Sequence, residues 1–109
     1  MNTLRFGVAG TALVLLAGPG LAADESDATA LLQEGRCTKC HAVAREKVAP
    51  PFVKIAAKYM GKADAVATLT RHVTVASEVE VDGEKEQHAL LKTQDPARIR
   101  NLVEWILSR

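Results

Sequence analysis

The sequence predicts a small all-α domain of three to four short helices, with a small irregular or β-like excursion near residues 73–82. Apolar residues recur at helical spacing in several segments, and residues that typically begin or end helices flank these segments. In residues 73–82 the apolar period changes to two, which is the period of an extended strand. The length of 109 residues bounds the chain to one domain.

Residues 6–17 form an apolar run that follows a single Arg, and small residues continue to Ala22 and Ala23. This layout is typical of a secretory signal peptide. A membrane anchor is the alternative, but glycines interrupt the run, and it is shorter than the roughly 20 apolar residues that cross a bilayer. We expect residues 1–23 to be a signal peptide, cleaved after Ala22 or Ala23. Residues 24–109 then form one periplasmic domain without stable membrane insertion.

The composition of this domain excludes some classes of protein. The chain has 14 Lys and Arg against 13 Asp and Glu, and removal of the one Arg in the leader makes the two counts equal. A near-neutral domain is not typical of a nucleic-acid-binding protein. A domain of this size has a small core and usually needs a covalent or metal staple. Only two cysteines are available, and their close spacing disfavours a disulfide framework.

The first predicted helix covers residues 27–37, with Ser26 as its N-cap. Ala28, Leu31 and Leu32 lie on one face of this helix, at the spacing of a buried stripe. Because the helix ends at the first cysteine, it delivers both cysteines at its end.

The second and third predicted helices are short. The second begins at Pro50-Pro51 and ends at Gly61, and the third covers about residues 63–72. Their apolar stripes are formed by Phe52, Ile55, Ala56 and Tyr59 in the second helix and by Val66, Leu69 and Val73 in the third. We interpret both stripes as packing faces.

In the excursion, valines alternate with polar residues as far as the turn signal Asp82-Gly83. We expect an extended segment or a small hairpin, followed by a charged loop over residues 84–87. In the last predicted helix, Asp95 is a good N-cap and Pro96 suits the first helical position. The apolar stripe of this helix, which contains Trp105, consists of Ile99, Leu102, Val103 and Ile106.

The segment Cys37-Thr38-Lys39-Cys40-His41 is a C-x-x-C-H sequence. In this pattern two thiols add to the two vinyl groups of haem, and the adjacent imidazole reaches the iron. A thioredoxin-like redox pair is an alternative, but it is expected near a βαβ pattern, which is missing here. A zinc site needs two further ligands at short spacing, whereas His72 and His88 are isolated. We therefore predict covalent haem attachment.

The expected domain resembles a small class I bacterial cytochrome c over nearly its whole length. The residues that carry the resemblance are the attachment motif, Ala49-Pro50-Pro51-Phe52, Ile55-Ala56-Ala57-Lys58-Tyr59 and Leu102-Val103-Glu104-Trp105-Ile106-Leu107.

The resemblance implies the class I cytochrome c fold around one haem c per chain. It implies thioether bonds from Cys37 and Cys40, with His41 as the proximal iron ligand. It also implies that the backbone carbonyl of Pro50 accepts a hydrogen bond from the His41 imidazole, which orients the ring and raises its basicity. The first and last helices of the family pack across each other, which would bury Leu31, Leu32, Leu102, Trp105 and Ile106.

The chain departs from this family at the second axial ligand. Class I cytochromes usually supply a Met from the loop ahead of the last helix, but this loop contains none. Met60 lies too early in the chain to come round to the opposite haem face. His88 lies where the Met is expected, so we predict His88 as the distal iron ligand. For His72 we expect a partly exposed surface position, with ligation of the iron or a place near the haem edge as the alternatives.

These observations predict an electron-transfer protein and not an enzyme. A bis-His haem has a lower reduction potential than the usual Met/His haem. We expect a periplasmic one-electron carrier whose redox partner proteins, donor and acceptor, are unknown. Service as the electron acceptor of a periplasmic dehydrogenase is one role that this hypothesis includes. The alternative is a haem protein that binds or senses O2, NO or CO at an open or labile distal site.

The charged residues suggest how a partner is oriented. Basic residues follow the attachment motif, and acidic residues crowd the excursion. The basic residues are Lys39, Arg45, Lys47, Lys54, Lys58 and Lys62, and the acidic ones are Glu78, Glu80, Asp82, Glu84 and Glu86. If the two groups occupy different faces, the resulting dipole steers the domain toward an acidic partner. Ordinary solvation of these side chains is the alternative.

Overall fold

The computed structural model describes residue 10, residues 12–14 and residues 23–109. Most of the expected signal peptide, residues 1–23, lies outside the described residues. Within the described part of the chain, no helix is both long and apolar enough to cross a membrane.

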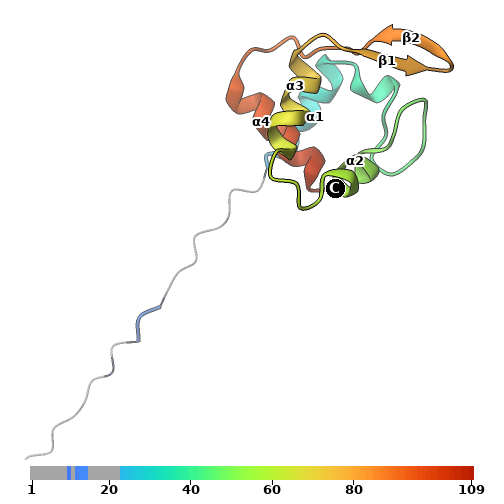
Figure 1. Cartoon of the computed structure of the whole chain (residues 1–109). Coiled ribbons are helices and arrows are strands. Elements are labelled where there is room, and N and C mark those ends of the chain that lie inside the picture. The colour runs from blue at the N-terminus through green and yellow to red at the C-terminus, as the bar shows by residue number, and fades with distance from the viewer. Residues whose placement is uncertain (1–9, 11, 15–22) are drawn as a thin grey trace, which may run out of the picture.

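The described part contains four α-helices, one 3₁₀ turn and one two-stranded sheet (Figure 1). In chain order these are α1 (Glu25–Glu34), the 3₁₀ turn η1 (Cys37–Lys39), α2 (Phe52–Tyr59), α3 (Ala65–Thr74), β1 (Glu78–Val81), β2 (Glu84–Gln87) and α4 (Pro96–Leu107). The predicted all-α class with one small β-like excursion is confirmed.

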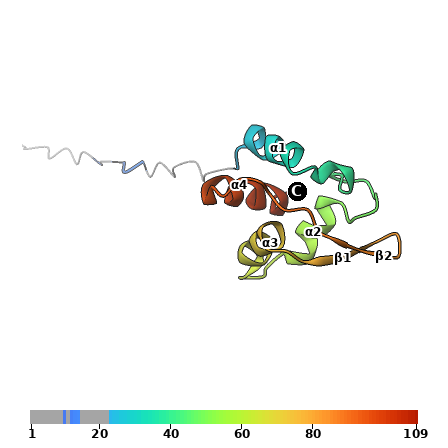
Figure 2. The same ribbon diagram turned by 90° about the horizontal axis from the view of Figure 1, so that it is seen from above.

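The core forms around α4, which packs against α1, α2 and α3. In Figure 2, α4 lies between α1 and α3. The predicted packing of the first helix on the last is therefore confirmed. The five residues expected in the core are all buried, namely Leu31, Leu32, Leu102, Trp105 and Ile106. The ring of Phe52 meets Trp105 edge-on, with 5.7 Å between centroids, and this contact attaches α2 to the core.

The first helix begins earlier and ends earlier than predicted. Its N-cap is Asp24, whose carboxylate accepts a hydrogen bond from the backbone N–H of Asp27 at 3.1 Å, so the cap assigned to Ser26 was wrong. The helix ends at Glu34 because Arg36 takes the left-handed conformation, with φ of 56°. Cys37 therefore begins the separate turn η1 and Cys40 caps its end, so neither cysteine lies on the helix itself.

The segment predicted as a charged loop, residues 84–87, is the strand β2, so this prediction was wrong. It pairs antiparallel with β1, and Val81 lies opposite Glu84. Asp82 and Gly83 have φ of 52° and 81°, which are the left-handed conformations of a two-residue hairpin turn. This turn brings β1 and β2 together as antiparallel neighbours. All four residues of β2 are exposed, which explains why its sequence shows no apolar alternation.

The boundaries of the other helices differ little from the prediction. α3 runs on to Thr74, two residues beyond the predicted end, so the first valine of the alternating stretch belongs to a helix. The start of the last helix is as predicted. The Asp95 carboxylate accepts a hydrogen bond from the backbone N–H of Ala97 at 2.9 Å, and Pro96 is the first helical residue.

Candidate haem site

The turn η1 places two thiols and one imidazole close together. The left-handed Arg36 redirects the chain after α1. The backbone N–H groups of Cys40 and His41 then both donate to the carbonyl oxygen of Cys37, at 3.2 Å and 2.9 Å. Both thiols are free and half-buried. Burial raises the pKa of the Cys37 thiol, so it is protonated at neutral pH.

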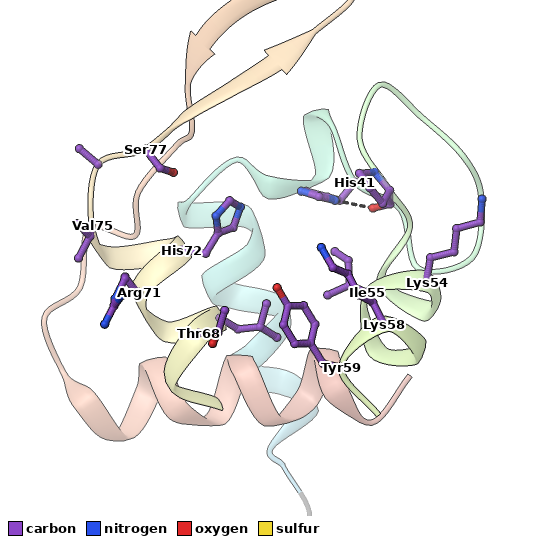
Figure 3. Close-up of a pocket in the computed structure, with 13 residues that line it drawn as sticks. His41, Lys54, Ile55, Lys58, Tyr59, Thr68, Arg71, His72, Val75 and Ser77 are labelled. Atoms are coloured by element: carbon purple, nitrogen blue, oxygen red, sulfur yellow. Dashed lines mark hydrogen bonds between the residues drawn. The ribbon is translucent and has the colours of Figure 1, made fainter. Parts of the chain in front are cut away.

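The ring of His41 is held in one orientation. Its Nδ1–H donates a hydrogen bond to the backbone carbonyl of Pro50 at 2.6 Å, shown as a dashed line in Figure 3. The ring of Phe52 stacks on it, with 5.3 Å between centroids and 19° between planes. Because Nδ1 carries the proton, Nε2 keeps a free lone pair. His41 is thus prepared to bind a metal through Nε2.

A cavity of about 390 Å³ collects the residues singled out from the sequence. Its lining includes Cys37, Cys40, His41 and His88. The apolar part of the lining comes from Leu32, Val48, Phe52, Ile55, Leu69, Val73, Val79, Val81, Leu102 and Ile106. An apolar wall with a few convergent nitrogen and sulfur atoms is typical of a cofactor site.

A second cavity of about 670 Å³ adjoins the first, and His41 and His72 line both. Its rim carries Lys54, Lys58, Tyr59 and Arg71, which Figure 3 shows around the opening between α2 and α3. We call the two cavities together the crevice.

His88 directly follows β2 and lines the smaller cavity together with His41. The centroids of the two rings are 6.5 Å apart, and their planes make an angle of 62°. The Nδ1 atom of His88 is buried and has no hydrogen-bond partner. Burial, with the nearby His72 and His41, lowers the pKa of His88, so the ring is neutral at pH 7, as a metal ligand requires.

His72 lies at the end of α3 and is exposed, as predicted, but its ring lines the crevice. It lies against His88, with 4.0 Å between ring centroids. Burial lowers the pKa of His72 as well, with smaller effects of His41 and Lys58. The sequence analysis missed this contact, because residues 16 positions apart meet only where the chain turns back after α3.

Met60, which the sequence analysis weighed as an iron ligand, lies outside the crevice. Met60 caps α2, is 81% exposed and does not line either cavity. Within the described residues, no group of three or more His, Cys, Asp or Glu side chains gathers as a metal site. The arrangement therefore offers no support for zinc bound by the cysteine pair.

The separation of the imidazoles fits an iron between His41 and His88. A metal about 2 Å from each of two facing ring nitrogens places the ring centroids about 6 Å apart. The observed 6.5 Å agrees with this distance, whereas the 4.0 Å between His72 and His88 leaves no room for a metal. The residues present therefore fit a haem attached at Cys37 and Cys40.

The family model described as Cytochrome c matches residues 26–109. The chain belongs to the cytochrome c family. This cytochrome therefore has the class I fold predicted from its sequence, and membership implies a covalently bound c-type haem and the electron-carrier role typical of the family.

Solved structures of class I cytochromes are similar to this cytochrome. The crystal structure of the class 1 cytochrome MtoD from Sideroxydans lithotrophicus ES-1 is 45% identical, with a TM-score of 0.76, over 80% of this chain and 97% of MtoD. Wild-type cytochrome c552 from Nitrosomonas europaea is 28% identical, with a TM-score of 0.58, over 73% of this chain and 96% of its own. The N64Del mutant of that c552 is 29% identical, with a TM-score of 0.59 and the same coverage. No protein with a curated description matches the chain.

Proposed function

We propose that this cytochrome is a periplasmic one-electron carrier with one haem c per chain. Cys37 and Cys40 hold the haem through thioether bonds, and His41 and His88 bind the iron from its two sides. The observation that carries this proposal is the single crevice lined by both thiols and both imidazoles, with the rings 6.5 Å apart. The haem supplies the redox chemistry, while the residues around it exclude water and orient the ligands.

The ligand pair sets the expected reduction potential. Two imidazoles stabilise ferric iron better than an imidazole and a thioether do, because thioether sulfur favours the reduced state. The hydrogen bond from His41 to Pro50 makes the proximal ring a stronger donor, but the family resemblance implies the same bond in His/Met members, so the difference comes from His88. We therefore expect a potential below the range of His/Met cytochromes c.

The carrier exchanges electrons with partner proteins, and one role that suits it is the electron acceptor of a periplasmic dehydrogenase. The export signal predicted from residues 1–23 supports a periplasmic location. Binding of O2, NO or CO needs an open or labile position on the iron. The presence of His88 in the same cavity, with its ring 6.5 Å from that of His41, argues against that alternative.

The decisive measurement is the absorption spectrum of the oxidised protein, extended into the near infrared. The wild type is compared with His88→Ala and with Met60→Leu, all purified from a host that attaches haem. We expect a low-spin bis-imidazole spectrum that His88→Ala abolishes. Met60→Leu should leave it unchanged, because Met60 lies outside the crevice.

Two other outcomes would contradict the proposal. A sulfur-to-iron band in the wild type, lost in Met60→Leu, would identify Met60 as the ligand. A high-spin wild type that binds carbon monoxide rapidly and stoichiometrically when reduced would favour the ligand-binding function.

A further inference from the structure

Two buried polar atoms near the end of the hairpin have no hydrogen-bond partner. Within the described residues, the buried side-chain atoms without a partner are Ser77 Oγ, His88 Nδ1 and Trp105 Nε1. Trp105 belongs to α4, whereas Ser77 and His88 flank the two strands of the hairpin. Buried polar atoms are rarely left unpaired in folded proteins, so the two at the hairpin require an explanation.

Ser77 and His88 are opposite each other across the base of the hairpin. The strands pair with Glu78 opposite Gln87, and the next pair in this register is Ser77 with His88. The backbone N–H of His88 donates to the carbonyl oxygen of Ser77 at 2.9 Å, which extends the ladder by one pair. Opposite residues of an antiparallel pair project their side chains from the same face, with Cβ atoms about 4.5–5.5 Å apart.

Both side chains face the crevice. Ser77 lines the larger cavity, and Figure 3 shows its side chain on the same side of the opening as His72. His88 lines the smaller cavity. The hydroxyl group and the imidazole therefore start from neighbouring backbone positions and line two adjoining cavities.

We propose that Ser77 is a positioning residue for His88. Its hydroxyl oxygen accepts a hydrogen bond from His88 Nδ1–H, which leaves Nε2 to face His41 and bind the iron. In the structure the two atoms are not hydrogen-bonded to each other, so the proposed contact requires Ser77 to change between staggered rotamers. The inference rests on the proposed ligation by His88, and it gives the distal ring an orienting partner, as Pro50 is for His41.

His72 is the other side chain against His88, but it does not suit this role. The two rings are 4.0 Å apart at their centroids and tilted by 41°, so they touch mainly through their faces. A ring nitrogen donates or accepts a hydrogen bond in the plane of the ring. The ring of His72 therefore packs against the distal ring. Backbone groups of His72 and Ala89 also lie near His88 and act to raise its pKa, but Nδ1 has no hydrogen-bond partner in the structure, and Ser77 is the side chain that we propose to hold its proton.

The proposed hydrogen bond from His88 to Ser77 changes the chemistry of the iron ligand, which packing of Ser77 against the ring does not. A partner that accepts from the second nitrogen of an imidazole raises the basicity of the ring, and loss of such a partner typically costs about 10–100-fold in metal binding. Ser77→Ala should therefore weaken the bond from His88 and favour ferrous iron. A tenfold loss of preference for ferric iron corresponds to a rise in potential of about 59 mV for one electron.

The experiment compares the wild type with Ser77→Ala, Ser77→Thr and Ser26→Ala, each with haem attached. Ser77→Thr keeps the hydroxyl group, and Ser26→Ala removes an exposed hydroxyl group on α1 as a matched control. The measurements are the reduction potential and the affinity of the ferrous protein for carbon monoxide, which competes with His88. For Ser77→Ala we expect a higher potential and about tenfold tighter carbon monoxide binding. Both values should return toward the wild type in Ser77→Thr and stay unchanged in Ser26→Ala.

The outcomes separate this inference from the proposed function. If His88→Ala abolishes the bis-imidazole spectrum but Ser77→Ala equals the wild type in both measurements, His88 is the ligand and the role of Ser77 is wrong. The role of Ser77 is also wrong if Ser77→Ala and Ser77→Thr shift both values equally, because the hydroxyl group is then irrelevant. If the wild type lacks a bis-imidazole spectrum, both proposals fail together.

Discussion

At the scale of single residues, the attachment turn depends on a close approach at Gly35. This residue is buried at the end of α1. A Cβ atom added there would lie 3.2 Å from Cys37 Sγ and 3.2 Å from Leu91 Cδ2. Leu91 is itself anchored, because its backbone N–H donates to the carbonyl oxygen of Val73. Gly35 therefore lets α1, the attachment turn and the segment after His88 meet.

This contact predicts the effect of Gly35→Ala. Ala normally stabilises a helical position by up to about 1 kcal/mol relative to Gly. Here the added methyl group crowds Cys37, whose sulfur cannot move freely once it is bound to haem. We expect a loss of about 1–3 kcal/mol, the usual cost of overpacking, and a lower yield of attached haem. Thermal unfolding and the ratio of haem to protein measure the two effects, and a gain in stability would contradict the crowding.

At the scale of elements, the hairpin carries the proposed distal ligand. His88 follows β2 directly, and its backbone is bonded to Ser77 just before β1. Val79 and Val81 of β1 are half-buried and line the crevice. The residues of β2 are exposed, although Glu86 and Gln87 lie at the edge of the crevice lining. The position of His88 thus depends on strand pairing and not on packing of β2. Anything that loosens the turn at Asp82 and Gly83 should loosen His88.

Two glycines offer a matched test of this dependence. Gly61 and Gly83 have φ of 75° and 81°, and an added Cβ atom would meet no neighbour at either position. Ala at each position should cost about 1 kcal/mol of backbone strain. We expect similar losses of thermal stability, but only Gly83→Ala should ease replacement of His88 by carbon monoxide, by about fivefold. An equal effect of Gly61→Ala on carbon monoxide binding would show that the hairpin has no special role.

At the scale of the whole molecule, the two groups of charges lie on different parts of the domain. The acidic residues belong to the hairpin, which lies apart from α2 in Figure 1. Lys54 and Lys58 of α2 line the larger cavity. Ion pairs lower the net charge of both groups, since Lys54 pairs with Glu46 and Lys85 pairs with Glu78. The rim of the larger cavity is therefore basic, whereas the lining of the smaller cavity has both signs, with Arg36, Lys39, Glu80 and Glu86.

This distribution predicts how the reduced protein reacts with small charged oxidants. Oxidation by hexacyanoferrate(III), an anion, should slow as ionic strength rises, because salt screens its attraction to the basic rim. Oxidation by the cation hexaammineruthenium(III) should not show this slowing. Lys58→Gln should lower the rate with the anion by about twofold to fivefold, the effect of an exposed charge pair of up to about 1 kcal/mol.

Arg100→Gln is the control for this test. Arg100 is an exposed residue of α4, where it pairs with Glu104, and it does not line the crevice. The same change in net charge at this position should leave the rate nearly unchanged. Equal effects of the two variants, or rates independent of salt, would show that the charges serve solvation alone.

Local features of the sequence predicted the helices and the attachment motif. The cap at Asp95, the apolar stripes and the Asp82-Gly83 turn act through neighbouring residues, so the one-dimensional pattern contains them. The boundaries of α1 and the pairing of β2 were wrong. The start of α1 depends on whether Asp24 or Ser26 occupies the N-cap position. The pairing of β2 depends on a turn that brings it against β1, although β2 has no apolar face.

The sequence by itself determined the fold class and the attachment motif, because spacing within one turn is enough to place two thiols and an imidazole together. It also pointed to His88 by its position ahead of the last helix. Only the tertiary structure decided that His88 and His41 line one cavity with their rings 6.5 Å apart, that His72 lies against His88 and that Ser77 is opposite His88 in the hairpin. The physical reason is that these contacts join residues from different elements, whose approach depends on how α3, the hairpin and the attachment turn pack around the core.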